Sequence, residues 1–152
     1  MTRSSPKDNK QLPTGVDLNR PALGIRYPWL ELILRGIKTI EIRNWNTQYR
    51  GKLYLYASRQ HADADYSRQR IEVHQLQLQE LPHAVVVGEI ELMHTRRATS
   101  QDERRAQVPA KVLAGQFAWE LANPIRYDEP IPPLVKPYGS WFYPFQRKKK
   151  PS

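Results

Sequence analysis

Three charged residues follow a glycine in the first third of the chain. Gly36, Lys38, Glu41 and Arg43 belong to the segment GIKTIEIR. The two cations can bind a phosphate or a base edge, and the carboxylate can accept from an exocyclic amine or act as a general base. A simpler interpretation is an ion pair in which Glu41 neutralises one of the cations. We favour a functional role, because burying several charges is costly and perturbed charges gather at sites.

Aromatic residues near this cluster offer surfaces for base stacking, which contributes roughly 1–3 kcal/mol per base. The candidates are Tyr27, Trp29 and Trp45. Trp29 is predicted to belong to a buried helix, which favours a structural role for it. Trp45 stands between Asn44 and Asn46 in a predicted loop and is therefore the better stacking candidate.

Two sets of residues are candidates for a site, one for binding and one for catalysis. For a nucleic-acid site, the predicted binding residues are Lys38, Glu41, Arg43, Trp45, Arg26, Tyr27, Arg50 and Lys136. For an enzyme, the candidate catalytic residues are Lys38, Glu41 and Thr39.

The elements that must position these side chains can be predicted from local patterns. Residues 21–26 begin the folded part as a short strand. Pro28 suits the first turn of a mostly buried helix, which ends at Gly36. Residues 39–43 alternate, so Glu41 and Arg43 share one face of a strand. Lys38 lies at the turn into this strand, and we expect it to project over the mouth of a cleft.

The rest of the chain predicts further short elements. Strands are expected at 52–58, 84–93 and 116–121. Gly88 inside the second of these indicates a bulge or the close approach of another backbone. Residues 61–81 are polar and predicted to be partly helical, and Ser100 is a candidate N-cap of a helical segment closed by Gly115. Five or six strands without a strand–helix rhythm predict an α+β fold, a small mixed β-barrel with short flanking helices.

The positive charge is unevenly distributed along the chain. The 152 residues carry a net charge of +9, and residues 23–59 hold seven Lys/Arg against two Asp/Glu. This distribution favours an anionic partner such as RNA or single-stranded nucleic acid. We divide the chain into a disordered basic arm at 1–20, a domain at 21–146 and a basic tail at 147–152.

Other classes of protein are disfavoured. The chain has no cysteine, which excludes disulfides, thiol catalysis and cysteine-ligated zinc. Its four histidines are scattered, so we expect neither a metal nor a cofactor. The sequence lacks both an apolar run of membrane-spanning length and a secretory signal, so we expect a soluble, cytoplasmic protein without a membrane partner.

Several segments together resemble a known family. These are LGIRYPWLELILRGIKTIEIRNW, YRGKLYLYAS, VVVGEIEL and FAWELANPIRYDEPIP, followed by a Lys-Pro-Tyr-Gly-Ser-Trp segment. In this order they resemble the ASCH domain of the PUA-like superfamily over about residues 22–143. The Gly-x-Lys-Thr-x-Glu-x-Arg turn is the most specific piece. In the closing segment Pro137 follows Lys136, where the family usually has Lys-Gly.

The resemblance implies a PUA-like barrel with a cleft beside the Lys38 turn and RNA or nucleotide ligands. One enzymatic branch of the family releases acetate from N4-acetylcytidine with a Lys, a Thr and a Glu, and another branch is ribonuclease-like. The Lys of the first branch corresponds to Lys38, but its Thr corresponds to Glu41. We therefore expect a nucleic-acid-binding module, with a hydrolase of a modified nucleoside or of RNA as the alternative. A third possibility is a protein-interaction module.

Overall fold

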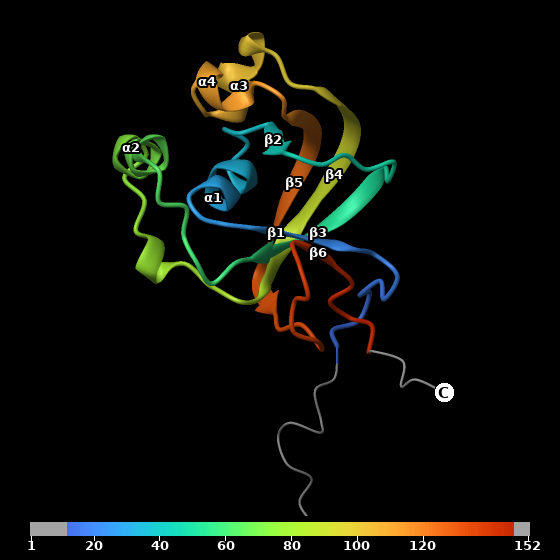
Figure 1. Cartoon of the computed structure of the whole chain (residues 1–152). Coiled ribbons are helices and arrows are strands. Elements are labelled where there is room, and N and C mark those ends of the chain that lie inside the picture. Colours follow the sequence, from blue (N-terminus) through green and yellow to red (C-terminus); the bar gives the residue numbers. More distant parts are fainter. Residues whose placement is uncertain (1–11, 148–152) are drawn as a thin grey trace, which may run out of the picture.

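The computed structural model describes residues 12–147 of the chain (Figure 1). The strands are β1 (Ala22–Ile25), β2 (Ile40–Arg43), β3 (Gly51–Ala57), β4 (Val86–Arg97), β5 (Phe117–Ile131) and β6 (Trp141–Phe142). The helices are α1 (Trp29–Leu34), α2 (Asp65–Val73), α3 (Glu103–Ala106) and α4 (Ala110–Leu113), with short 3-10 turns η1 (Leu78–Glu80) and η2 (Ser100–Asp102).

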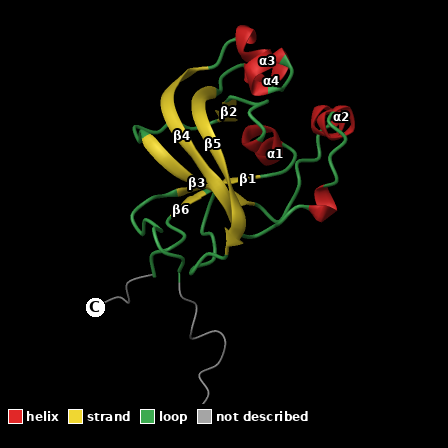
Figure 2. Ribbon diagram, turned by 180° about the vertical axis from the view of Figure 1, so that it is seen from behind, coloured by secondary structure: helices red, strands yellow, loops and turns green. Residues whose placement is uncertain are grey.

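One mixed sheet contains all six strands, in the order β2-β5-β4-β3-β1-β6. β1 pairs with β3 in parallel, and the other pairs are antiparallel. The sheet curls into a half-barrel, and the helices gather on one side of it (Figure 2). The predicted α+β fold, with six strands and short flanking helices, is therefore confirmed.

Both faces of the sheet are packed, as strand β3 shows. Leu53 and Leu55 belong to the main core, which includes the apolar side chains of α1. Tyr54 and Tyr56 point to the other face and pack in a second cluster with Phe142. Leu53 and Leu55 thus lie opposite Tyr54 and Tyr56, and all four side chains are buried.

Strand β5 is longer than the sequence predicts, because it continues past Asn123-Pro124 to Ile131. Asn123 adopts a left-handed conformation with φ 55°. The pairing with β4 shifts there, from Glu91↔Ala122 to Glu89↔Ile125. The dipeptide therefore makes a bulge, from which the strand resumes, rather than a strand end.

Gly88 of β4 fulfils the prediction of a close backbone approach. A Cβ atom added to this residue would lie 2.2 Å from the carbonyl oxygen of Ile125. No side chain can be accommodated at that separation. The bulge in β5 is therefore matched by a glycine in the strand beside it.

Residues 12–20 correct the expectation of a disordered arm. Leu12 and Val16 pack on the second cluster, and the backbone N–H of Asp17 donates to the Tyr54 hydroxyl at 2.7 Å. The Arg20 guanidinium lies 4.7 Å from the centre of the Tyr54 ring. The folded part thus begins before residue 21, while residues 1–11 and 148–152 of the predicted arm and tail lie outside the described residues.

The predicted helical segment from Ser100 to Gly115 is divided into η2, α3 and α4. Gln107 ends α3 with a left-handed φ of 61°, and Pro109 precedes α4. The carboxylate of Asp102 accepts from the backbone N–H of Thr99 at 2.8 Å, so the polar cap lies one residue before Ser100. Between residues 12 and 147, no helix combines the length and apolar character needed to cross a membrane.

Candidate functional site

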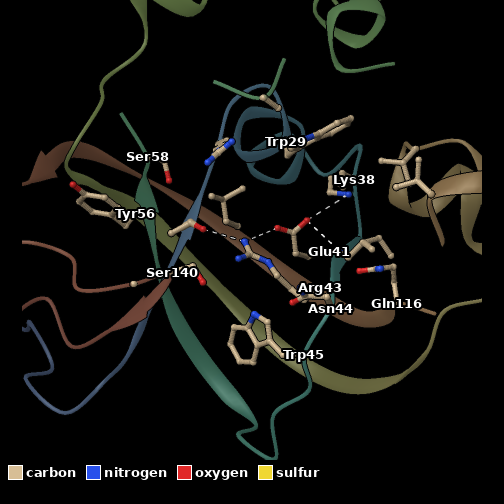
Figure 3. A pocket seen from close by; sticks show the side chains of 18 of the residues that line it. Trp29, Lys38, Glu41, Arg43, Asn44, Trp45, Tyr56, Ser58, Gln116 and Ser140 are labelled. Atoms are coloured by element: carbon tan, nitrogen blue, oxygen red, sulfur yellow. Dashed lines mark hydrogen bonds and ion pairs between the residues drawn. The ribbon is translucent and has the colours of Figure 1, made fainter. Parts of the chain in front are cut away.

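A pocket of about 720 Å³ opens beside the turn that precedes β2 (Figure 3). Its walls come from the ends of β1 and β3, from α1, β2, α2 and α4, and from the segment before β6. The lining residues used below are Arg26, Trp29, Lys38, Glu41, Arg43, Asn44, Trp45, Ser58, Tyr66, Gln116 and Ser140. Its volume lies within the range of about 300–1,000 Å³ that is usual for small-ligand sites.

Lys38, Glu41 and Arg43 form one ion-pair network in this pocket (Figure 3). The Lys38 ammonium lies 3.6 Å from Glu41 Oε1, and the Arg43 guanidinium donates to Glu41 Oε2 at 2.8 Å. Lys38 also donates to the carbonyl oxygen of Ala106 at 2.5 Å, and Arg43 to that of Gly24 at 3.0 Å. The three charged groups therefore pair with one another, and they do so in the wall of a pocket.

The backbone around α1 and β2 places this network. Gly36 adopts φ 76° at the end of α1, a conformation that glycine adopts without strain. The backbone N–H groups of Ile37 and Lys38 then both donate to Leu32 O. β2 follows as an edge strand paired only with β5. The turn is thereby fixed at both ends, and Lys38 is directed inward.

The sequence predicts that Lys38 projects over the cleft mouth, but the structure places it elsewhere. Its side chain is only 1% exposed and lies in the wall of the pocket. Burial lowers the pKa of the Lys38 ammonium to about 8, although Glu41 opposes this effect and Arg43 adds to it. Burial also acts to raise the pKa of Glu41, but Arg43 and Lys38 outweigh it and hold that pKa below its ordinary value. Glu41 is thus a carboxylate at neutral pH beside a lysine that loses its proton at mildly basic pH.

Aromatic side chains stand on both sides of the network (Figure 3). On one side Trp29 packs against Tyr66 of α2 at 5.9 Å between ring centres, and the Lys38 ammonium lies 5.1 Å from the Trp29 ring. On the other side Trp45 packs edge-to-face on Trp119 at 4.8 Å. Trp29 begins α1 and packs against the core, as expected for a structural role, but it is only half-buried and also lines the pocket.

The structure brings together five of the predicted binding residues, namely Arg26, Lys38, Glu41, Arg43 and Trp45. Tyr27 does not line the pocket. It is fully buried, and its hydroxyl donates to Pro82 O at 2.7 Å, so it has no free face on which a base could stack. Its pKa is raised by burial.

Three other predicted residues also lie outside the pocket. Arg50 donates to Thr47 O, Tyr49 O and Thr95 Oγ1, so it braces its own loop. Thr39 accepts from the Arg105 guanidinium at 3.2 Å and is not among the residues that line the pocket. Lys136 lines neighbouring hollows. The sequence did not reveal these partners of Arg50 and Thr39, because spacing does not show which partner a polar side chain will find.

Sequence reasoning missed several polar and aromatic residues of the pocket. Tyr66, Gln116, Ser58 and Ser140 come from four different segments. No local pattern marks them, since they meet only through the tertiary fold. Asn44 was detectable, because it adjoins both Arg43 and Trp45. Within residues 12–147, no group of three or more His, Asp or Glu side chains is placed to hold a metal ion.

Comparison with known proteins gives a consistent result. The family model described as "ASCH domain" matches residues 23–131. The crystal structure of ASCH from Zymomonas mobilis superimposes with a TM-score of 0.50 at 17% identity, covering 76% of this chain and 75% of that one. A mutant of that protein gives a TM-score of 0.51 at 16% identity, with the same coverage. At these identities the likeness concerns the fold alone.

Two relatives are similar over a short segment. Activating signal cointegrator 1 from Homo sapiens and from Mus musculus are each 44% identical to this chain over 36 residues. That segment is 24% of this chain and 6% of either relative. The chain thus matches only a small part of the length of these curated relatives.

Proposed function

Because the chain belongs to the ASCH domain family, whose PUA-like fold is often linked to RNA binding, we propose that its pocket binds a nucleotide of RNA or of another single-stranded nucleic acid. The observation that carries this proposal is the composition of the pocket. A buried network of two cations and one carboxylate stands between an aromatic pair and Trp45. Such a site offers stacking surfaces, donors and an acceptor within a single cavity.

Each component has a plausible part in recognition. The aromatic rings can stack on a base, whose flat faces are alike in all nucleotides. The Glu41 carboxylate can accept from an exocyclic amine, and Asn44 and Gln116 can pair with base edges. Arg26 is exposed at the pocket edge, where it suits a phosphate. The lining contains Arg26, Lys38 and Arg43 against Glu41 as its one carboxylate, so an anion is attracted.

The proposal is tested by titrating single-stranded RNA, single-stranded DNA and duplex at several salt concentrations. We expect single strands to bind best, with an affinity that falls as salt rises. Trp45→Ala should weaken binding roughly 5- to 150-fold, the equivalent of one lost stacking contact. Trp45→Phe should retain most of the affinity. Because Trp45 also packs on Trp119, thermal unfolding must show that both variants are folded.

A matched control is Lys52→Ala, which removes an exposed cation of β3 that pairs with Glu89 at 3.6 Å. It lies outside the pocket lining and should leave the affinity within about twofold of wild type. Wild-type protein that binds no single strand at low salt, or a Trp45→Ala variant with unchanged affinity, would refute the proposal.

One observation favours a second candidate function, hydrolysis of a modified nucleoside or of RNA. The pKa of Lys38, lowered to about 8, makes a neutral amine available at mildly basic pH, and Glu41 lies beside it. A neutral amine can take up a proton, as a general base does. Incubation with N4-acetylcytidine and with RNA, followed by assays for acetate and for cleavage, tests this candidate. Turnover that is lost in Lys38→Arg while substrate still binds would favour the enzyme over the binding module.

A further inference from the structure

A second hollow of about 1030 Å³ adjoins the pocket; we call it the side groove. It is bounded by the end of β3 with the following residues Arg59 and Gln60, and by the proline-rich segment 132–139. Five residues line both cavities: Arg26, Tyr56, Ser58, Pro137 and Gly139. The two cavities therefore lie side by side along these shared residues.

The charge of the side groove differs from that of the pocket. Its lining includes three cations, Arg26, Arg59 and Lys136, and no carboxylate among the described residues that form it. In the pocket, by contrast, Glu41 neutralises part of the positive charge. Arg59 and Lys136 are both exposed, so they can contact a solvated anion. The side groove thus matches a ligand that carries only negative charge.

The walls of the side groove are held in place before any ligand binds. The segment 132–139 contains three prolines, which restrict its backbone. At one end Leu134 N donates to Pro144 O at 2.8 Å, and just beyond the other Gly24 N donates to Ser140 O at 2.7 Å. A preformed anion site loses little conformational entropy when it binds.

From this adjacency and charge we infer that the side groove binds the sugar–phosphate backbone next to the nucleotide in the pocket. The inference rests on the proposed function and makes it more specific. The ligand is a strand in which the bound nucleotide has a neighbour, rather than a free nucleoside or mononucleotide. Arg59 and Lys136 are its phosphate contacts, and Arg26, shared by both cavities, lies where the strand passes from one to the other.

A strand suits this arrangement better than an acidic peptide does. The pocket offers aromatic faces for a flat ring, whereas the side groove offers cations for an anion. A nucleotide strand presents a ring and a phosphate in every repeat, so consecutive parts of one ligand meet the two kinds of surface. An acidic peptide is complementary to the cations but not to the paired aromatic rings.

The test compares the four mononucleotides with a single-stranded pentanucleotide of mixed sequence. In wild-type protein, log affinity for the pentanucleotide should fall more steeply with log salt than that for any mononucleotide. The double variant Arg59→Ala/Lys136→Ala should reduce the magnitude of the pentanucleotide slope by about 1.4, because each phosphate contact on a single strand contributes about 0.7. Its affinity for the pentanucleotide should fall roughly tenfold, while mononucleotide affinity stays within about twofold.

A second double variant serves as the control. Lys52→Ala/Arg68→Ala also removes two exposed cations, but neither residue lines the pocket or the side groove. Its salt slope should equal that of wild type. Circular dichroism and thermal unfolding should show that both double variants are folded, since surface substitutions usually change stability by less than about 0.5 kcal/mol.

The possible results separate this inference from the proposed function. If the pentanucleotide slope is unchanged in Arg59→Ala/Lys136→Ala while Trp45→Ala still weakens binding, the side-groove inference is wrong and the proposed function stands. Equal losses for mononucleotides and pentanucleotide would also overturn it, as would competition by oligoglutamate as strong as by the strand. If wild type binds neither class of ligand, the proposed function fails and this inference fails with it.

Discussion

The buried ammonium of Lys38 should make the stability of the domain depend on pH in an unusual direction. Its pKa in the folded protein is about 8, against an ordinary value of 10.5. The folded state therefore binds this proton less tightly than the unfolded chain does. Stability should rise as the pH increases from 8 to 10.5, since the unfolded chain holds the proton over that window and the folded protein does not.

The expected size of the effect follows from the same values. At 1.36 kcal/mol per pH unit, a pKa lowered from 10.5 to about 8 corresponds to roughly 3 kcal/mol. Lys38→Met removes the titrating group and keeps an unbranched side chain. The free energy of unfolding of wild type minus that of Lys38→Met should therefore be constant below pH 8. Above it, the difference should increase by roughly 3 kcal/mol up to pH 10.5.

Urea unfolding of both proteins at closely spaced pH values between 6.5 and 10.5 measures this difference. Groups that titrate alike in the two proteins cancel in the subtraction. NMR of the Lys38 side chain labelled with ¹³C at Cε gives its pKa independently. A difference that stays flat, or one that falls with rising pH, would refute the conclusion that burial outweighs the attraction of Glu41.

Two further predictions concern stability. Gly88→Ala places a Cβ where Ile125 O is 2.2 Å away, so it should lower the free energy of unfolding by more than about 3 kcal/mol in chemical denaturation. Gly139→Ala, which has open space around its Cβ, should change that free energy little. Equal effects of the two substitutions would contradict the close packing of β4 and β5. Hydrogen bonds from Arg96 hold the pKa of Asp102 at about 2. The free energy of unfolding of wild type should therefore exceed that of Asp102→Asn by ~2 kcal/mol at pH 5, and this difference should disappear as the pH falls from 4 to 2. A difference that persists at pH 2 would contradict the role of Arg96.

Local patterns in the sequence predict most of the strands but not all of their lengths. β1, β2 and β3 begin and end within a residue or two of the expected positions, because their apolar alternation is clear. β5 was predicted to end at Leu121, since Asn123-Pro124 is a typical turn signal. Asn123-Pro124 interrupts the regular pairing only locally, and the strand continues beyond it because β4 remains its hydrogen-bonded partner. Such rescue of a strand by its neighbour is a tertiary effect.

For the candidate site, too, local features could be predicted from the sequence and tertiary contacts could not. Lys38, Glu41 and Arg43 could be grouped from sequence because they are separated by only two or three residues along one turn and strand. The pairing of Trp29 with Tyr66 could not be predicted, because α2 has a weak apolar pattern and lies 37 residues further along the chain. Arg50 was expected to bind a ligand, and local spacing did not reveal that its guanidinium donates to Thr47 O and Tyr49 O in its own loop and to Thr95 Oγ1 of β4.

The two ends of the described chain meet at one side of the sheet, away from α3 and α4 (Figure 1). Gln146 donates to Asn19 across a 3.1 Å hydrogen bond, although the two residues are 127 positions apart. A unit whose entry and exit points are adjacent can be inserted into a surface loop of a host protein, or circularly permuted, without stretching either connection. The domain is therefore suited to transfer into another protein, with both junctions close together at Asn19 and Gln146, neither of which lines the pocket.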